Sequence, residues 1–238
     1  MLLRYPVWDV SYDVAVVFTI ATVQDSSTEF SDWAGGLIVF IGATVFEFGS
    51  VLLMFEAVNE NRSDCFGWAV EETVDGILYL NLSWWPTWYE LRTYYFYEIG
   101  FLACSSQTFG ATVFWISGFT ALPPILNSLS TPAENGAYWL PQVIGGTGFI
   151  VSSMLFMLEV QSCWYIPAPG VLGWYIGLWN LIGAIGFTLC GALGFGTIQP
   201  GVEYALTLST FIGSWVFLFE SLNKYPVWVD EKAGRLER

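Results

Sequence analysis

The sequence contains no histidine and few basic residues. Without an imidazole the chain has no Ser-His-Asp triad, no Cys-His pair and no zinc site that uses histidine. Only seven lysines and arginines stand against 21 acidic residues, which gives a formal net charge of −14. Proteins bind nucleic-acid backbones through Lys and Arg, so this charge balance argues against a nucleic-acid partner.

Cysteine is also scarce, and recognisable catalytic motifs are missing. The four cysteines are far apart and form no C-x-x-C pair, so we expect neither a disulfide framework nor a metal site. The sequence has no Walker loop, no H-E-x-x-H and no G-x-S-x-G. We therefore expect no cofactor, no catalytic residues and no enzymatic activity.

Charge of either sign is rare for a chain of this size. Charged residues make up 12% of the 238 residues and hydrophobic residues 55%, whereas a soluble domain carries about 25% charge. Residues 93–223 contain no Lys or Arg at all. This composition is typical of an all-α membrane protein with several spans, and it predicts the lipid bilayer as a partner.

Four segments are long enough to span a bilayer, which takes about 20 apolar residues. They are residues 33–58, 94–122, 138–160 and 171–195, and two shorter apolar runs lie at residues 14–23 and 205–219. Trp and Tyr cluster near the segment ends, as in Trp84–Tyr89 and Trp164-Tyr165, which is typical of membrane interfaces. We expect one membrane domain over residues 1–238, built as a polytopic transmembrane helix bundle.

The basic residues indicate the orientation of the spans. If both short runs also cross, the chain has six passes, and every basic residue falls on one side of the membrane: Arg4, Arg62, Arg92, Lys224, Lys232, Arg235 and Arg238. The positive-inside rule then places both termini, the polar loop 59–93 and the tail 221–238 in the cytosol. The loop would carry a surface helix near residues 66–82. With four passes the basic residues would face each other across the membrane.

The predicted first and third full spans contain an internal repeat. Residues 41–56 align without a gap with residues 144–159, and eight of the sixteen positions are identical. We interpret helices 33–58 and 138–160 as copies produced by duplication, which is frequent in transporter folds.

A shorter motif recurs in all the later spans: Gly, three residues, Phe, three residues, then Gly or Ser. Its copies are Gly42/Phe46/Ser50, Gly110/Phe114/Gly118, Gly145/Phe149/Ser153, Gly183/Phe187/Gly191 and Gly213/Phe217/Ser221. A spacing of four places the three residues on one helix face, where small residues let helices approach closely. Successive spans run in opposite directions, which favours helix packing over a shared ligand site.

Long stretches of the chain resemble an uncharacterised family of fungal multi-pass integral membrane proteins. The resemblance covers residues 40–62, 98–123 and 138–193, including FIGATVFEFGSVLLMFEAVNENR and YWLPQVIGGTGFI. The Gly-x3-Phe motif is similar to the small YrhK-like membrane domain. The resemblance implies a helical membrane protein without established activity and with no catalytic residues to carry over. The chain departs from the pattern at both ends, where Gln24-Asp25 and Glu220 interrupt the apolar runs.

One acidic residue, Glu47, lies near the middle of a predicted span. A charge at that depth costs roughly 2.5–3.5 kcal/mol, so such residues face a protein interior or a wet cavity. Gln107 and Asn180 lie at similar depth, and the three side chains together form a candidate proton or cation site. The alternative is a neutral Glu47 held by its neighbours. Two functions follow: a helix-packing or scaffold-type protein that binds itself or another membrane protein, or a small transporter or channel that uses Glu47.

Overall fold

The computed structural model describes residues 29–59, 86–196, 201–202 and 204–216, and every regular element among them is helical. Four helices are long and apolar enough to cross a membrane. They are α2 (Glu29–Asn59), α5 (Ile99–Thr120), α8 (Leu140–Glu159) and α9 (Leu172–Gly194). The shortest has 20 residues, or about 30 Å of helix, which equals the thickness of a hydrocarbon core.

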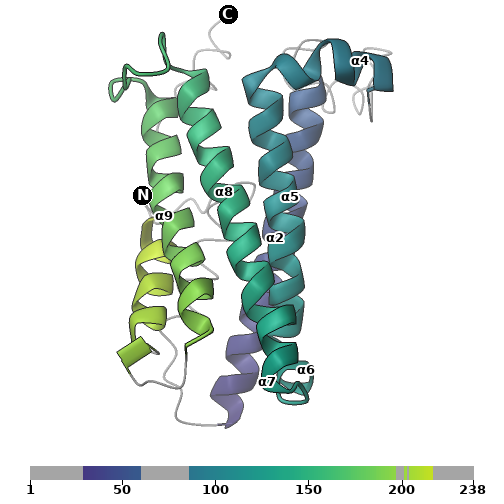
Figure 1. Ribbon diagram of the computed structural model, residues 1–238, viewed down its shortest axis with the longest axis vertical. Coiled ribbons are helices and arrows are strands. Elements are labelled where there is room, and N and C mark those ends of the chain that lie inside the picture. Colours follow the sequence, from purple (N-terminus) through teal and green to yellow (C-terminus); the bar gives the residue numbers. More distant parts are fainter. Residues whose placement is uncertain (1–28, 60–85, 197–200, 203, 217–238) are drawn as a thin grey trace, which may run out of the picture.

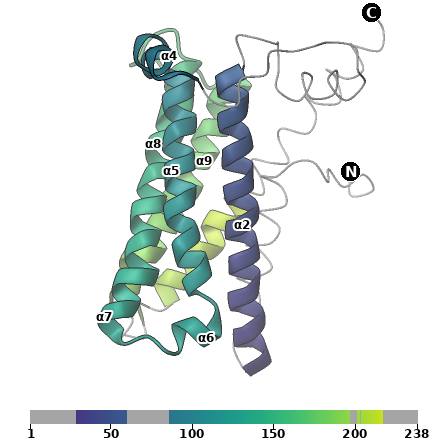
Figure 2. The same ribbon diagram turned by 90° about the vertical axis from the view of Figure 1, so that its right-hand side faces the viewer.

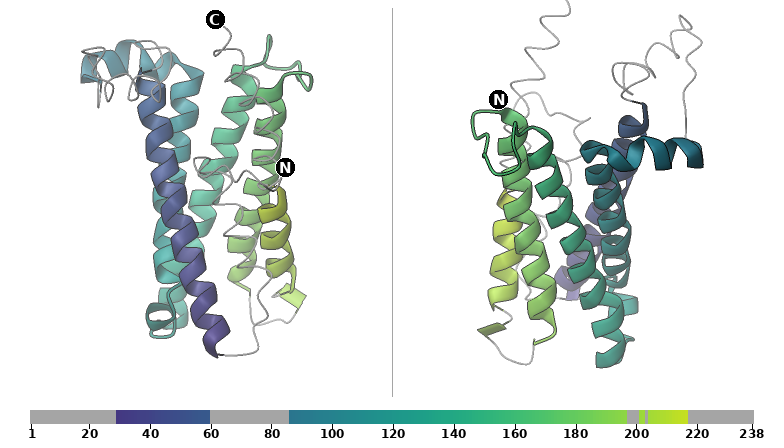
Figure 3. Two further views of the ribbon diagram at one scale, coloured as in Figure 1. Left: turned by 180° about the vertical axis from the view of Figure 1, so that it is seen from behind. Right: turned by 45° about the horizontal axis from the view of Figure 1, so that its top comes forward.

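The long helices stand side by side, and neighbours in sequence are neighbours in space (Figure 1). α5 packs between α2 and α8, and α8 packs between α5 and α9. The chain reverses direction at each connection, so the end of α2, the start of α5, the end of α8 and the start of α9 share one end of the molecule (Figures 1 and 3). Residues 204–216 form a further helix that packs against α9. The contact is close, since a Cβ at Gly186 of α9 would lie 2.9 Å from the carbonyl oxygen of Ser209.

A short helix, α4 (Trp88–Thr93), lies across one end of α5 (Figure 2). Thr87 and Glu90 start it with a capping box: the Thr87 N–H donates to Glu90 Oε2 over 2.8 Å, and the Glu90 N–H donates to Thr87 Oγ1 over 3.4 Å. A single 3₁₀ turn, Tyr95–Tyr97, then leads into α5. The capping box explains why a helix forms here although the segment is too short to be stable alone.

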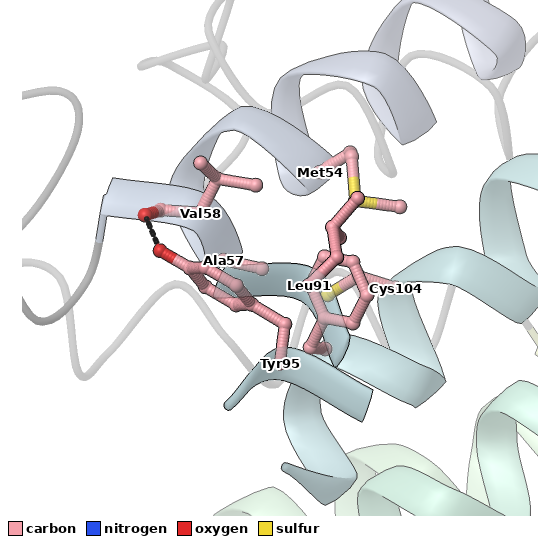
Figure 4. Packing of buried hydrophobic residues seen from close by; sticks show 7 residues of the cluster. Met54, Ala57, Val58, Leu91, Tyr95 and Cys104 are labelled. Atoms are coloured by element: carbon pink, nitrogen blue, oxygen red, sulfur yellow. Dashed lines mark hydrogen bonds between the residues drawn. The ribbon is translucent and has the colours of Figure 1, made fainter. Parts of the chain in front are cut away.

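A hydrophobic cluster fixes α4 and the 3₁₀ turn to the ends of α2 and α5 (Figure 4). Its buried residues are Met54, Ala57, Val58, Leu91, Tyr95, Phe101 and Cys104. The Tyr95 hydroxyl donates a 2.8 Å hydrogen bond to the carbonyl oxygen of Val58, near the last turn of α2. That carbonyl has no partner within its own helix, so the tyrosine satisfies a polar group that burial would otherwise leave unpaired.

At the other end, short helices connect α5 to α8. They are α6 (Pro123–Leu126), α7 (Thr131–Glu134) and the π-helical segment η2 (Asn135–Trp139), which runs directly into α8. Proline at the first positions of α6 and α7 starts each helix without losing a hydrogen bond. Trp139 is buried against Gly194 of α9, and its Nε1 donates to Glu134 Oε1 over 3.0 Å.

The all-α class and the four long apolar helices confirm the corresponding predictions from the sequence. The predicted start of the second span is wrong by five residues, because the tyrosine-rich stretch after Arg92 forms the 3₁₀ turn and α5 begins at Ile99. The predicted polar loop 59–93 contains α4. The predicted short run 14–23, the surface helix 66–82 and the tail 221–238 lie outside the described residues.

Candidate functional site

The carboxylate of Glu47 points from α2 toward α5. Thr112 of α5 donates its hydroxyl to Glu47 Oε1 over 2.8 Å. Glu47 Oε2 is buried and has no hydrogen-bond partner among the described residues. One carboxylate oxygen is therefore held by a neighbouring helix, while the other is removed from solvent without compensation, which is costly for a polar atom.

Other polar side chains lie along the contact between α2 and α5. We call this row the polar seam; it consists of Thr44, Glu47, Thr108, Thr112 and Trp115. Thr108 Oγ1 lies 3.0 Å from the carbonyl oxygen of Ser50, and Trp115 Nε1 donates to Thr44 Oγ1 over 3.0 Å. Thr112 Oγ1 also lies 2.9 Å from the carbonyl oxygen of Thr108. A hydroxyl has one proton, so Thr112 donates either to Glu47 or to its own helix at a given moment.

The other two residues of the candidate site do not join Glu47 in a described hydrogen bond. Gln107 is half-buried on α5, next to Thr108. Asn180 is half-buried on α9, which packs against α8, whereas α2 packs against α5. The structure thus pairs Glu47 with Thr112, a residue that sequence reasoning missed. The available signal was the four-residue spacing of Thr108 and Thr112 on one face of α5.

The phenylalanines of the repeated motif meet in the middle of the molecule and form an aromatic row. The ring of Phe149 lies 4.9 Å from that of Phe46 and 5.7 Å from that of Phe114, measured between centroids. Phe114 in turn lies 6.0 Å from Phe187. These separations suit favourable edge-to-face and tilted aromatic pairs. The row connects α2, α5, α8 and α9, and alanines 43, 111 and 184 pack around it.

The small residues of the motif lie at the helix crossings. A Cβ at Gly110 would lie 2.8 Å from the carbonyl oxygen of Gly145, and one at Gly145 would lie 2.7 Å from that of Gly110. A Cβ at Gly118 would lie 2.5 Å from the Cβ of Ala43. The remaining small members that the structure describes are also buried: Gly42, Ser50, Ser153, Gly183, Gly191 and Gly213. Backbones approach so closely at these crossings that no larger side chain fits without movement.

The helix pair α2–α5 has the same contact register as the pair α8–α9. Gly118 of α5 faces residues 39, 40 and 43 of α2, and Gly191 of α9 faces residues 142 and 143 of α8. The register of the repeat, extended by two residues, aligns positions 39 and 40 with 142 and 143, and the motif aligns Gly118 with Gly191. At the other end, Gly177 meets Met157, and the aligned residue Cys104 packs in one cluster with Met54.

No group of three or more His, Cys, Asp or Glu side chains in the described part of the chain is placed to hold a metal ion. Of the described cysteines, Cys104 and Cys190 are buried and Cys163 is exposed. The chain matches no protein-family model, no curated protein and no solved structure.

Proposed function

We propose that this protein is an integral membrane protein with several spans. The observation that carries the proposal is the outward surface of the four long helices, which exposes large apolar side chains where water would require polar ones. Examples are Phe48, Leu52, Phe109, Ile116, Val151, Met154, Ile185 and Leu189. The buried faces instead carry glycine, alanine, serine and the aromatic row. Small residues inside and large apolar residues outside are what a lipid solvent favours.

Exposed aromatic side chains support this placement. Trp88 begins α4, and Tyr97 ends the 3₁₀ turn before α5. Trp164 and Tyr165 lie between α8 and α9, at the same end of the molecule. Trp88 is 71% exposed and Trp164 is 81% exposed. Tryptophan and tyrosine favour the headgroup level of a bilayer, so this end lies at a membrane interface. Arg92 is at this same end, which the positive-inside rule assigns to the cytosol.

We further propose that the fold arose by duplication of a two-helix unit. The support is the shared contact register of α2–α5 and α8–α9. The pattern continues into the helix at residues 204–216. A Cβ at Gly213 of this helix would lie 3.2 Å from the carbonyl oxygen of Gly183 in α9, and the pair Gly145 of α8 and Gly110 of α5 makes the corresponding contact. This helix therefore stands to α9 as α8 stands to α5. With it as a span, and residues 14–23 as another, the chain has six passes and cytosolic termini.

The role that the geometry supports best is that of a packing or scaffold protein within the membrane, without enzymatic activity. The aromatic row and the glycine crossings make a rigid body, and the exposed outer faces are available to a second copy or to another membrane protein. The suggested fungal family remains a prediction.

Extraction of membranes with alkaline carbonate tests the membrane proposal. An integral protein stays with the membrane pellet, whereas a peripheral protein is released. Rigidity of the packed helices is tested by hydrogen exchange in detergent: slow exchange of amides around Phe114 and Phe149 is expected, and fast exchange there would contradict a scaffold built on the aromatic row.

A second function, proton or cation transport at Glu47, is favoured by one observation: Glu47 Oε2 is buried and unpaired among the described residues. A transported cation or proton would satisfy that oxygen. Single cysteines at Ser50 and at Phe48, in a chain whose four native cysteines are serine, distinguish the two functions. A water path to Glu47 makes the cysteine at position 50 react with a soluble maleimide, while the one at the outward position 48 stays inert. If the cysteine at position 50 does not react with the maleimide, the result favours the scaffold function.

A further inference from the structure

A groove of about 470 Å³ runs along the outer surface of α5 below α4. Its lining combines Met54 of α2, Leu91 of α4, Phe96 of the 3₁₀ turn, and Phe101, Phe109 and Val113 of α5. The volume lies within the range of ligand pockets, about 300–1,000 Å³. The groove adjoins the polar seam, and Thr108 and Thr112 contribute to both.

The hydroxyl groups that line the groove all have hydrogen-bond partners within the protein. Ser105, Thr108 and Thr112 are the hydroxyl-bearing residues of its lining. Ser105 bonds the carbonyl oxygen of Phe101 over 2.8 Å, and Thr108 bonds that of Cys104 over 3.0 Å. Thr112 bonds Glu47 or Thr108, as described above. The occupant therefore meets carbon and sulfur atoms, which suits a hydrocarbon chain and does not suit a polar molecule.

The depth of the groove matches one leaflet of a bilayer. From Phe101 to Val113 is twelve residues, or about 18 Å of helix rise. Half of a hydrocarbon core of about 30 Å is about 15 Å. The groove begins at the end of α5 where α4 lies and extends past the middle of the span, as far as Val113, a length that a single acyl chain can fill.

The mouth of the groove carries a positive charge. Arg92 is exposed on α4, four residues after Trp88 of the lining, so both lie on one face of that helix. It is the only basic residue in the part of the chain that the structure describes. The nearby carboxylate of Glu90 is engaged by the Thr87 N–H and hydroxyl in the capping box. An arginine at the headgroup level attracts an anionic phosphate.

We propose that this groove binds an acyl chain of an anionic phospholipid, with the lipid phosphate against Arg92. The inference rests on the proposed membrane insertion. α4 then serves as a clamp that holds the lipid between its own face and α5, and the hydrophobic cluster around Tyr95 keeps the clamp in place.

Native mass spectrometry of the full-length protein in mild detergent tests the proposal. The protein is titrated with phosphatidylglycerol and, separately, with phosphatidylcholine carrying identical chains. The wild type is expected to bind phosphatidylglycerol about fivefold more tightly, as one cation at an anionic headgroup contributes about that factor. Arg92→Gln is expected to abolish this preference, and Arg92→Lys to keep it. A preference that survives Arg92→Gln would overturn the phosphate contact.

Groove-filling variants test the acyl chain. Val113→Trp and Ser105→Phe fill different depths of the groove and are expected to weaken both lipids about tenfold, while Leu189→Trp on the exposed face of α9 changes neither. Unchanged binding in both filling variants would mean that another segment or a second copy covers the groove, and the proposal would fail. Inorganic phosphate at millimolar concentration is expected not to displace the lipid; displacement would point to a free-anion site.

Carbonate extraction of the same variants separates the two proposals. Release of the wild type from the membrane would contradict membrane insertion itself. If the wild type stays in the membrane but lipid binding depends neither on the headgroup nor on the groove-filling substitutions, only the proposed lipid site is contradicted.

Discussion

Gly110 and Gly145 face each other where α5 crosses α8, and a Cβ on either would lie within 2.8 Å of the carbonyl oxygen of the other. This reciprocal contact lets the two backbones touch and brings the aromatic row together. The glycine pair thus determines how closely the two halves of the described structure approach each other.

Replacing Gly110 with alanine is expected to destabilise the protein by about 1–3 kcal/mol, because the added methyl group overpacks the crossing. Gly35→Ala is the matched control, since a Cβ there would meet nothing within 4 Å. In that open position alanine is expected to be neutral or to stabilise by a few tenths of a kcal/mol. The free energy of unfolding in mixed detergent micelles measures the difference. Equal stabilities would contradict the close crossing.

Phe114→Ala is expected to remove the centre of the aromatic row and to cost about 3 kcal/mol of stability, because a large buried side chain leaves a cavity. Phe114 is 5% exposed, whereas Phe48 of α2 is 68% exposed. Phe48→Ala therefore serves as the control and is expected to change stability by well under 1 kcal/mol. The free energy of unfolding in mixed detergent micelles again measures the difference between the two variants. A comparable loss from Phe48→Ala would show that the assignment of inner and outer faces is wrong.

Tyr95→Phe is expected to free the clamp formed by α4. The substitution removes the hydrogen bond to the Val58 carbonyl and leaves that buried group unpaired, at a cost of about 1 kcal/mol. Amide hydrogen exchange in α4 is expected to become severalfold faster. Tyr97→Phe is the control, because Tyr97 is 80% exposed. An exchange rate in Tyr95→Phe equal to that of the control would show that the hydroxyl does not hold the clamp.

The polar seam predicts energetic coupling between Glu47 and Thr112. A double-mutant cycle with Glu47→Leu and Thr112→Val is expected to give an interaction energy of about 0.6 kcal/mol, typical of hydrogen bonds between membrane helices. Thr147→Val provides the control, since the Thr147 hydroxyl bonds only the carbonyl of Val143 among the described residues. Coupling of Glu47 to Thr147 as strong as to Thr112 would contradict the observed pairing.

The long helices were predictable because lipid-compatible spans must be long, apolar runs. The predicted segments 33–58, 138–160 and 171–195 differ from α2, α8 and α9 by a few residues at most. The start of α5 was missed because the aromatic stretch Tyr94–Tyr97 carries no charge that would separate it from the span, and an uncharged run does not distinguish a 3₁₀ turn from an α-helix. The capping pattern Thr87-x-x-Glu90, which starts α4, is the sequence signal that predicts this helix.

The partner of Glu47 was not predictable in the same way. Periodicity shows which residues share a helix face, but not which helix lies opposite that face. Thr112 meets Glu47 only because α5 is the direct neighbour of α2, while the helix that carries Asn180 lies beyond α8. Pairing across helices depends on the order of packing, which only the structure reveals.

Glycosylation mapping of topology tests the membrane account most directly. A loop carrying Asn-Ser-Thr is inserted between Leu129 and Ser130, at the end of the molecule opposite α4, and the protein is expressed in a eukaryotic cell. A mass shift that endoglycosidase removes is expected from the inserted site, and none from the native sequons at Asn61 and Asn81, which the proposed topology assigns to the cytosol. Modification of Asn61 or Asn81 would contradict the cytosolic assignment, and no modification of the inserted site would contradict the proposed crossing by α5 and α8.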